Sequence, residues 1–238
     1  MTSRRLFLAG LLTACSRAQS DVRLHSRPGQ PAGPTAKPGT SPLHLRAQRD
    51  ALLHVPTSAP DPAPLLLYLH GATGNEQQGI RRLGALADEF GFLLLSPASE
   101  DYTWDAIRSG YGPDVRFIDQ ALNKVFSQCR VDARRIAVCG FSDGASYALG
   151  LGISNAALFQ GIMAFSPCFV PPGAQKSGTP HIFISHGTKD EILPIESCSR
   201  QLVPQLKRSA YEITFQEFDG PHTVPPQIAR QAIEWFLK

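Results

Sequence analysis

The sequence predicts an α/β protein built on a mostly parallel β-sheet with helices on both faces. Two observations lead to this prediction. The candidate strands are mostly unbroken apolar runs, which are typical of strands buried on both faces. Segments with apolar residues at helical spacing separate most of them, and parallel strands need such crossover connections.

Each element follows from its local pattern. Buried strands are predicted at 65–70, 92–98, 135–141, 161–167 and 181–187, and a more exposed, alternating strand at 211–218. Helices are predicted at 78–90, 114–128, 144–154, 195–208 and 225–238, the last of which begins with prolines. Function in open α/β sheets gathers at the carboxyl ends of the strands, so the loops that leave these strands are the place to look for a site.

The composition describes a chain that can bury a core. Of its 238 residues, 42% are hydrophobic and 18% are charged, and the formal net charge is +3. Six of the cations lie near the beginning of the chain: Arg4, Arg5, Arg17, Arg23, Arg27 and Lys37. The rest of the protein is therefore close to neutral, without the basic stripe that follows phosphates, which argues against nucleic-acid binding.

The first residues, MTSRRLFLAGLLTACS, have the form of an export signal. Two arginines precede an apolar run at 6–12 that is far too short to span a bilayer. SRRLFL resembles the twin-arginine signal of bacterial export, and LTAC at 12–15 resembles the lipobox of bacterial lipoproteins. We expect 1–14 to be a signal peptide and Cys15 to carry a lipid anchor at the cell envelope. The alternative is an ordinary cleaved signal with Cys15 incidental, which predicts a periplasmic or secreted protein.

Residues 15–42 are expected to form a flexible or extended tether. This stretch is rich in Pro, Gly, Ser and Ala and lacks apolar periodicity. It should therefore bury too little surface to offset the entropy lost on ordering. The α/β domain is predicted to span 43–238.

Four further cysteines, Cys129, Cys139, Cys168 and Cys198, belong to this domain. Four cysteines allow three disulfide pairings, and the sequence does not choose among them. The loops that carry Cys168 and Cys198 could meet, but all four residues could equally be small buried apolar side chains. No C-x-x-C pair is present, which argues against a structural zinc site.

The stretch CGFSDGAS at 139–146 contains the short pattern G-x-S-x-G around Ser142. The pattern can arise by chance, but here it directly follows a predicted strand and precedes a predicted helix. In that context a nucleophilic serine is exposed on a tight turn, where Gly140 and Gly144 leave room for the crowded chain. The dipole of the following helix favours negative charge there. Ser142 is therefore the predicted nucleophile.

A serine hydroxyl needs a base to activate it, and the base needs an orienting acid. Asp190 and His222 each follow a separate predicted strand. The chain order Ser142, Asp190, His222 predicts that Asp190 is the acid and His222 the base. Glu191 would serve only if its loop were turned by one residue, and Asp219 lies too close to His222 along the chain.

An oxyanion hole is the remaining part of such a site. The backbone N–H of Asp143, directly after Ser142, is one predicted donor. The other is predicted from the loop HGATGN at 70–75, from the N–H of Ala72. Loss of one such donor typically lowers the rate by about 10²–10³-fold.

The stretches LLLYLHGATGN, GFSDGAS, IFISHGTKDEILPIE and EFDGPHTVPP resemble α/β-hydrolases of the phospholipase/carboxylesterase group, which includes acyl-protein thioesterases. The resemblance covers most of 65–238. It implies an α/β-hydrolase fold and hydrolysis of esters or thioesters without a cofactor, by Ser142, Asp190 and His222. Asp143 is a departure, since such enzymes more often carry an uncharged residue there. Its carboxylate would oppose an oxyanion, so we expect it to point away or to be paired.

Other candidate residues have two interpretations each. Trp104 follows the strand at 92–98 and could wall a substrate pocket or anchor its loop by packing. His70 and His186 each end a strand just before a glycine, where a histidine usually braces a loop. No metal is expected, because the histidines form no ligand cluster with nearby acids.

The connections between Ser142 and Asp190 are short and leave no room for a large lid. An open site favours small or short-acyl esters. An ester polymer such as a polyhydroxyalkanoate, or an acyl group on a cell-wall sugar, is an alternative substrate. An inactive hydrolase fold used as a binding module is the alternative from another class, although three triad residues on three loops argue against it.

Overall fold

The computed structural model describes residues 21–238, so the predicted signal peptide at 1–14 and the lipid site at Cys15 lie outside the described residues. One sheet of eight strands has the order β1-β2-β4-β3-β5-β6-β7-β8. The strands are β1 (Gly39–Pro42), β2 (Ala51–Val55), β3 (Ala63–Leu69), β4 (Leu93–Pro97), β5 (Val131–Phe141), β6 (Gly161–Phe165), β7 (His181–Gly187) and β8 (Ile213–Phe218). Neighbours from β4 to β8 pair in parallel, whereas β1 and β2 add an antiparallel edge.

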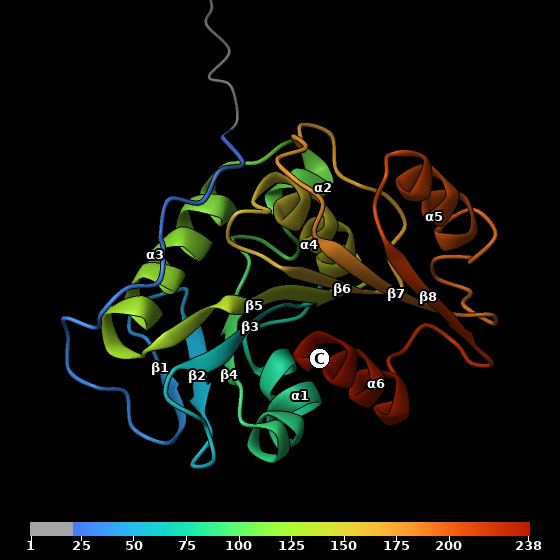
Figure 1. Ribbon diagram of the computed structural model, residues 1–238. Helices are drawn as coiled ribbons and strands as arrows, with labels where there is room; N and C mark the ends of the chain where they lie inside the picture. Colours follow the sequence, from blue (N-terminus) through green and yellow to red (C-terminus); the bar gives the residue numbers. More distant parts are fainter. Residues whose placement is uncertain (1–20) are drawn as a thin grey trace, which may run out of the picture.

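The helices cover both faces of this sheet. They are α1 (Gln77–Phe90), α2 (Asp105–Arg108), α3 (Pro113–Gln128), α4 (Asp143–Ser154), α5 (Ser199–Arg208) and α6 (Pro226–Leu237). α1 and α6 pack on one face, and α3, α4 and α5 pack on the other, each layer over its own hydrophobic cluster (Figure 1). None of the helices in residues 21–238 combines the length and apolar composition that crossing a bilayer requires. This is the α/β-hydrolase architecture that the sequence predicts.

The predicted elements appear with small shifts in their ends. α5 begins at Ser199 rather than 195, and it continues through Pro204 without a break. β8 is the exposed edge strand, as its alternating pattern predicts. The short elements β1, β2 and α2 were not predicted, because four or five residues carry too little periodicity to stand out.

The prediction of a tether is wrong for residues 21–42, which lie along the domain. Val22 and Leu24 are buried, with 1% and 2% of their surface exposed. The side chain of Asn155, at the end of α4, accepts from Leu24 N–H (2.8 Å) and donates to Val22 O (2.9 Å). The composition did not predict this attachment. Two buried apolar residues are enough to hold the segment when side chains of the domain form hydrogen bonds with its backbone.

Two of the four cysteines in the described domain form a disulfide. Cys168 and Cys198 are bonded, which joins the loop after β6 to the beginning of α5. Cys129 and Cys139 are free, and Cys139 is buried in β5. Of the three possible pairings, the structure has the one that joins the loops carrying Cys168 and Cys198.

Candidate active site

Ser142 lies on the sharp turn between β5 and α4. Its φ of 58° and ψ of −122° place a non-glycine residue in a strained backbone conformation. A Cβ atom at Gly140 would lie 2.1 Å from Gly144 O, and one at Gly144 would lie 2.2 Å from Leu69 O. Both positions therefore require glycine, and the turn holds the hydroxyl of Ser142 at the carboxyl edge of the sheet.

The three side chains predicted to act together meet in one hydrogen-bonded chain. His222 Nε2 is 2.9 Å from Ser142 Oγ, and His222 Nδ1 is 2.6 Å from Asp190 Oδ2. The imidazole also packs on the ring of Phe141, with 4.7 Å between ring centroids. In this geometry Ser142 can donate its proton to Nε2, while Asp190 accepts a hydrogen bond from Nδ1–H and remains ionised.

The loops after β7 and β8 are joined to each other, which brings His222 to Asp190. Lys189 N–H donates to Gly220 O over 2.9 Å. A Cβ atom at Gly187 would lie 2.3 Å from Gly220 O, so the two loops approach more closely than a side chain would allow. Asp219 pairs with Lys189 at the surface (2.7 Å), so its carboxylate is engaged away from the imidazole.

The carboxylate of Asp190 is buried and held at both oxygens. Oδ1 accepts from the backbone N–H groups of Ile192 (3.0 Å) and Leu193 (2.8 Å), while Oδ2 faces His222. Burial alone would raise the pKa of Asp190, but the hydrogen bonds from Leu193 and His222 hold it below its ordinary value. Asp190 therefore stays ionised at neutral pH. Glu191, the alternative acid, is exposed.

A second histidine contacts the same carboxylate. His186 Nε2 lies 2.8 Å from Leu193 O and 3.2 Å from Asp190 Oδ2, and its Nδ1 lies 2.7 Å from Ser199 Oγ. Burial lowers the pKa of His186, which keeps the ring neutral. These partners assign a tautomer in which Nε2–H donates to Leu193 O, close to Asp190, and Ser199 donates to Nδ1. His186 braces the loop, as its place before Gly187 predicts; its contact with Asp190 was not predicted.

The two predicted oxyanion donors border the same turn. Within residues 21–238, neither the N–H of Ala72 nor that of Asp143 has a hydrogen-bond acceptor. The loop of Ala72 lies against the nucleophile, since a Cβ atom at Gly71 would be 3.3 Å from Ser142 Cβ. His70 braces this loop: its Nδ1–H donates to Gly71 O over 2.8 Å, and burial lowers its pKa. The arrangement leaves both N–H groups free to bind an oxyanion.

The carboxylate of Asp143 is paired. Thr103 Oγ1 donates to Asp143 Oδ2 over 2.6 Å. Thr103 belongs to the loop after β4, so this bond also ties that loop to the first residue of α4. The expectation that Asp143 points away from the oxyanion hole or has a partner is met through Thr103.

Trp104 does not wall a pocket. Its side chain is 0% exposed and lies between His70 and Tyr147, with ring centroids 4.8 Å and 5.2 Å away. Its Nε1–H donates to His70 O over 2.8 Å. The prediction that Trp104 walls a substrate pocket is therefore wrong, and the packing interpretation is confirmed. Trp104 stabilises the loop of Ala72 through its contacts with His70. Sequence placed the residue on the correct side of the sheet but carried no information on its burial.

The acidic residues of the same loop have structural partners. Asp114 accepts from the N–H of Glu100 (2.8 Å) and of Asp105 (2.6 Å) and pairs with Arg49. Asp105 accepts from the hydroxyl of Tyr147 over 3.0 Å. Within residues 21–238, no group of three or more His, Cys, Asp or Glu side chains is arranged to hold a metal ion.

A comparison with known protein families shows which family the chain belongs to. The family model described as Phospholipase/Carboxylesterase matches residues 114–238, which is more than half of the chain and includes Ser142, Asp190 and His222. The chain is a member of the phospholipase/carboxylesterase family. Several of its relatives and structural neighbours are named as esterases. The loop of Ala72 precedes the matched residues.

The individual relatives of this family member are distant. The bifunctional acetylxylan esterase/xylanase XynS20E of Neocallimastix patriciarum is 31% identical over 154 residues, which are 62% of this chain and 22% of that protein. NocK of Nocardia uniformis subsp. tsuyamanensis is 27% identical over 208 residues, 83% of this chain and 51% of its own length. The chain thus spans about a fifth of one of these curated relatives and about half of the other.

Solved structures share the fold of this family member. FphF of Staphylococcus aureus, a fluorophosphonate-binding serine hydrolase solved with substrate bound, matches with a TM-score of 0.69. The two chains are 16% identical, and the match covers 87% of this chain and 100% of FphF. At that identity the likeness establishes the α/β-hydrolase fold alone.

Proposed function

We propose that this protein is an exported serine esterase that removes short acyl groups, acetyl above all, from a sugar polymer. The observation that carries the proposed mechanism is the chain of hydrogen bonds from Asp190 through His222 to Ser142, with the serine on a strained turn. A protein that only binds a ligand does not need a serine hydroxyl hydrogen-bonded to a histidine and an acid in this way.

The proposed reaction begins when Ser142 Oγ attacks the ester carbonyl and His222 Nε2 takes its proton. Asp190 stabilises the imidazolium, and the N–H groups of Ala72 and Asp143 bind the oxyanion. The intermediate collapses with loss of the sugar hydroxyl, which receives the proton from His222. Water then attacks the acyl-enzyme by the same steps, so carboxylic acid leaves and Ser142 is restored.

The preference for short acyl groups is proposed from the surroundings of Ser142. The segment 166–180 between β6 and β7 contains no helix, and no helical insertion covers the triad within residues 21–238. Ile192, two residues after the acid, is 69% exposed. A long acyl chain would gain little burial at so open a site, whereas an acetyl group needs none.

The sugar polymer is proposed from XynS20E, whose name includes an acetylxylan esterase activity. The match covers 22% of that bifunctional protein, and the family of the present chain favours the esterase half of its name. Export suits the same substrate, because a polymer of cell walls lies outside the cytoplasm. We propose that residues 1–14 direct export and that Cys15 anchors the protein to the envelope.

The experiment compares acetate release from acetylated xylan with hydrolysis of p-nitrophenyl esters of short and long acids. We expect acetate from acetylated xylan and a preference for p-nitrophenyl acetate over the palmitate, with both activities lost in Ser142→Ala. Turnover of p-nitrophenyl acetate without acetate from xylan would refute the sugar polymer. A preference for palmitate would refute the short acyl group.

Export and anchoring are tested on the whole chain in a bacterial host. We expect Cys15→Ser to move the protein from the membrane fraction to the soluble one, and Arg4→Lys/Arg5→Lys to retain it in the cytoplasm. An unchanged membrane fraction in Cys15→Ser would contradict the lipid anchor.

A further inference from the structure

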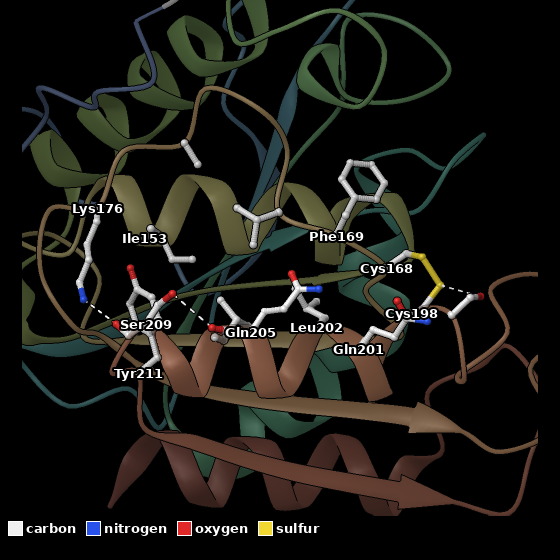
Figure 2. Close-up of a pocket in the computed structure, with 14 residues that line it drawn as sticks. Ile153, Cys168, Phe169, Lys176, Cys198, Gln201, Leu202, Gln205, Ser209 and Tyr211 are labelled. Atoms are coloured by element: carbon white, nitrogen blue, oxygen red, sulfur yellow. Dashed lines mark hydrogen bonds between the residues drawn. A yellow bond between two sulfur atoms is a disulfide. The ribbon is translucent and has the colours of Figure 1, made fainter.

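A cavity of about 430 Å³ lies between helix α5 and the segment 166–176 that follows β6 (Figure 2). Its volume falls within the range of about 300–1,000 Å³ that is typical of small-molecule sites. The disulfide between Cys168 and Cys198 borders one end of the cavity, and Lys176 and Tyr211 border the other. Ser142 does not line it, so the cavity is distinct from the catalytic centre.

The disulfide end of the cavity adjoins the triad on two sides. Cys168 N–H donates to Ser146 Oγ (3.1 Å), and Ser146 N–H donates to Ser142 O (3.1 Å), one helical turn away. On the other side, Cys198 directly precedes Ser199, whose hydroxyl contacts His186 beside the catalytic acid. The disulfide end is therefore the end of the cavity that lies nearer to Ser142.

From that end the cavity runs along α5. The helix has ten residues and is therefore about 15 Å long. Gln201 lies near the disulfide and Gln205 one turn further, and both side chains border the cavity (Figure 2). Lys176 Nζ donates to Ser209 O over 2.6 Å and lies 4.9 Å from the ring centroid of Tyr211, which closes the far end. The shape is a groove long enough for a short oligomer.

The lining combines an apolar floor with polar walls. Ile153, Leu202 and Leu206 form the floor, and each is 5% exposed. The amides of Gln201 and Gln205 stand on the exposed side of α5, and within residues 21–238 neither side chain makes a hydrogen bond. A fatty acyl chain would cover these amides without bonding them, which is unfavourable. A sugar chain offers apolar ring faces to the floor and hydroxyl groups to the amides.

Phe169 marks the entrance from the triad. It lies next to Cys168, lines the cavity, and is 39% exposed (Figure 2). An aromatic face in this position can pack on the apolar face of a pyranose ring. The entrance and the walls thus fit the same class of ligand.

We propose that this cavity binds the sugar chain of the substrate, with the acetylated unit at Ser142 and the neighbouring units along Gln201 and Gln205. The inference rests on the proposed function and adds where the polymer lies. Binding energy from units beyond the reacting one would raise kcat/KM with chain length, because remote contacts help to position the ester.

The test measures kcat/KM for acetylated xylose and for acetylated xylo-oligosaccharides of increasing length, each as a ratio to p-nitrophenyl acetate. We expect the ratio to rise about tenfold with chain length in the wild type. The double variant Gln201→Ala/Gln205→Ala should lose most of this rise, mainly through KM. Lys207→Ala is the matched control, because Lys207 is exposed on the same helix but does not line the cavity.

Binding is measured separately by calorimetry with unacetylated xylo-oligosaccharide and the inactive Ser142→Ala protein. We expect binding that Gln201→Ala/Gln205→Ala weakens at least about tenfold. Acetate release that is independent of chain length and of the double variant would overturn the cavity site while leaving the proposed function intact. No acetate from any sugar, with p-nitrophenyl acetate still cleaved, would overturn both. If kcat/KM rises with the length of the acyl group, and Gln201→Ala/Gln205→Ala removes that rise, the cavity binds an acyl chain instead of a sugar chain.

Discussion

Asp190 accepts more hydrogen bonds than orientation of His222 alone requires. Two backbone N–H groups hold one oxygen, and Nε2 of the neutral His186 ring lies 3.2 Å from the other. The surplus donors keep the acid ionised in a buried place and set the direction in which it faces the base. His186 touches no reacting atom, so we regard it as a positioning residue.

Replacement of His186 should therefore impair the chemical step more than substrate binding. We expect His186→Phe, which lacks both ring nitrogens, to lower kcat by about 10–100-fold with little change in KM, because the base is misplaced. His186→Gln keeps an N–H near the position of Nε2 and should recover most of the loss.

Equal activities of the two variants, both folded by circular dichroism, would show that the N–H of His186 has no positioning role. Wild-type kcat in His186→Phe would show the same.

The residues of the triad were predictable because their roles follow from chain order. A serine after one strand, an acid after another and a histidine after the last define the site before any coordinate is known. The burial of Trp104 was not predictable in this way, because it depends on His70 and Tyr147, which close over it from other segments. The contact of His186 with Asp190 likewise depends on how far the 188–193 loop folds back.

The segment before β1 is attached to the helical layer by a few specific bonds. Asn155 is 3% exposed and bonds both Val22 O and Leu24 N–H, while Asp119 Oδ1 accepts from the N–H of His25 (2.9 Å) and Ser26 (2.8 Å). Further along, β1 extends the sheet by pairing with β2. These residues belong to the folded domain.

Asn155→Ala should lower the free energy of unfolding by about 1–3 kcal/mol, because buried backbone groups lose their partners. Asn123→Ala, at an exposed position of α3, is the matched control and should stay within about 0.5 kcal/mol of wild type. A chain that begins at residue 43 should also unfold at lower urea concentration than one that begins at residue 21, since it lacks β1 and the anchors at Val22 and Leu24. Identical urea midpoints for the two chain lengths would contradict the attachment.

Long elements were predictable because their apolar pattern repeats over several turns or fills a whole strand, as in α3 and β3. β1 was not, since all four of its residues are exposed and it is defined by its pairing with β2. The prediction for 21–42 was wrong for a related reason: the composition of this segment is that of a linker. It is held by the side chains of Asn155 and Asp119, by backbone bonds to the end of α3 and by the pairing of β1 with β2.

The stability of the whole molecule should depend on pH through two buried neutral histidines. Burial lowers the pKa of His70 and of His186 in the folded protein, although Asp190 offsets part of this at His186. In the unfolded chain each returns to about 6.5. Below that pH the unfolded state binds more protons, so the free energy of unfolding falls by up to about 1.4 kcal/mol per pH unit for each histidine.

Urea unfolding at about pH 7.5, 6.5 and 5.5 measures this slope. We expect stability to be constant from about pH 7.5 to 6.5 and to fall below it, and the fall to be smaller in His186→Gln. His25→Gln, which replaces an exposed histidine, should leave the slope unchanged. A wild-type stability that does not change down to about pH 5.5 would contradict neutral burial of both rings.

We propose that Ser142, Asp190 and His222 are the catalytic residues, and covalent labelling tests this proposal most directly. A fluorophosphonate probe is applied to wild type, Ser142→Ala and His222→Ala, with the labelled peptide identified by mass spectrometry and hydrolysis of p-nitrophenyl acetate followed in parallel. We predict a single label on Ser142, no label in Ser142→Ala, and a fall in kcat of about 10⁶-fold in both variants. A label on another residue, or hydrolysis that survives in folded Ser142→Ala, would contradict the assignment of Ser142, Asp190 and His222 as the catalytic machinery.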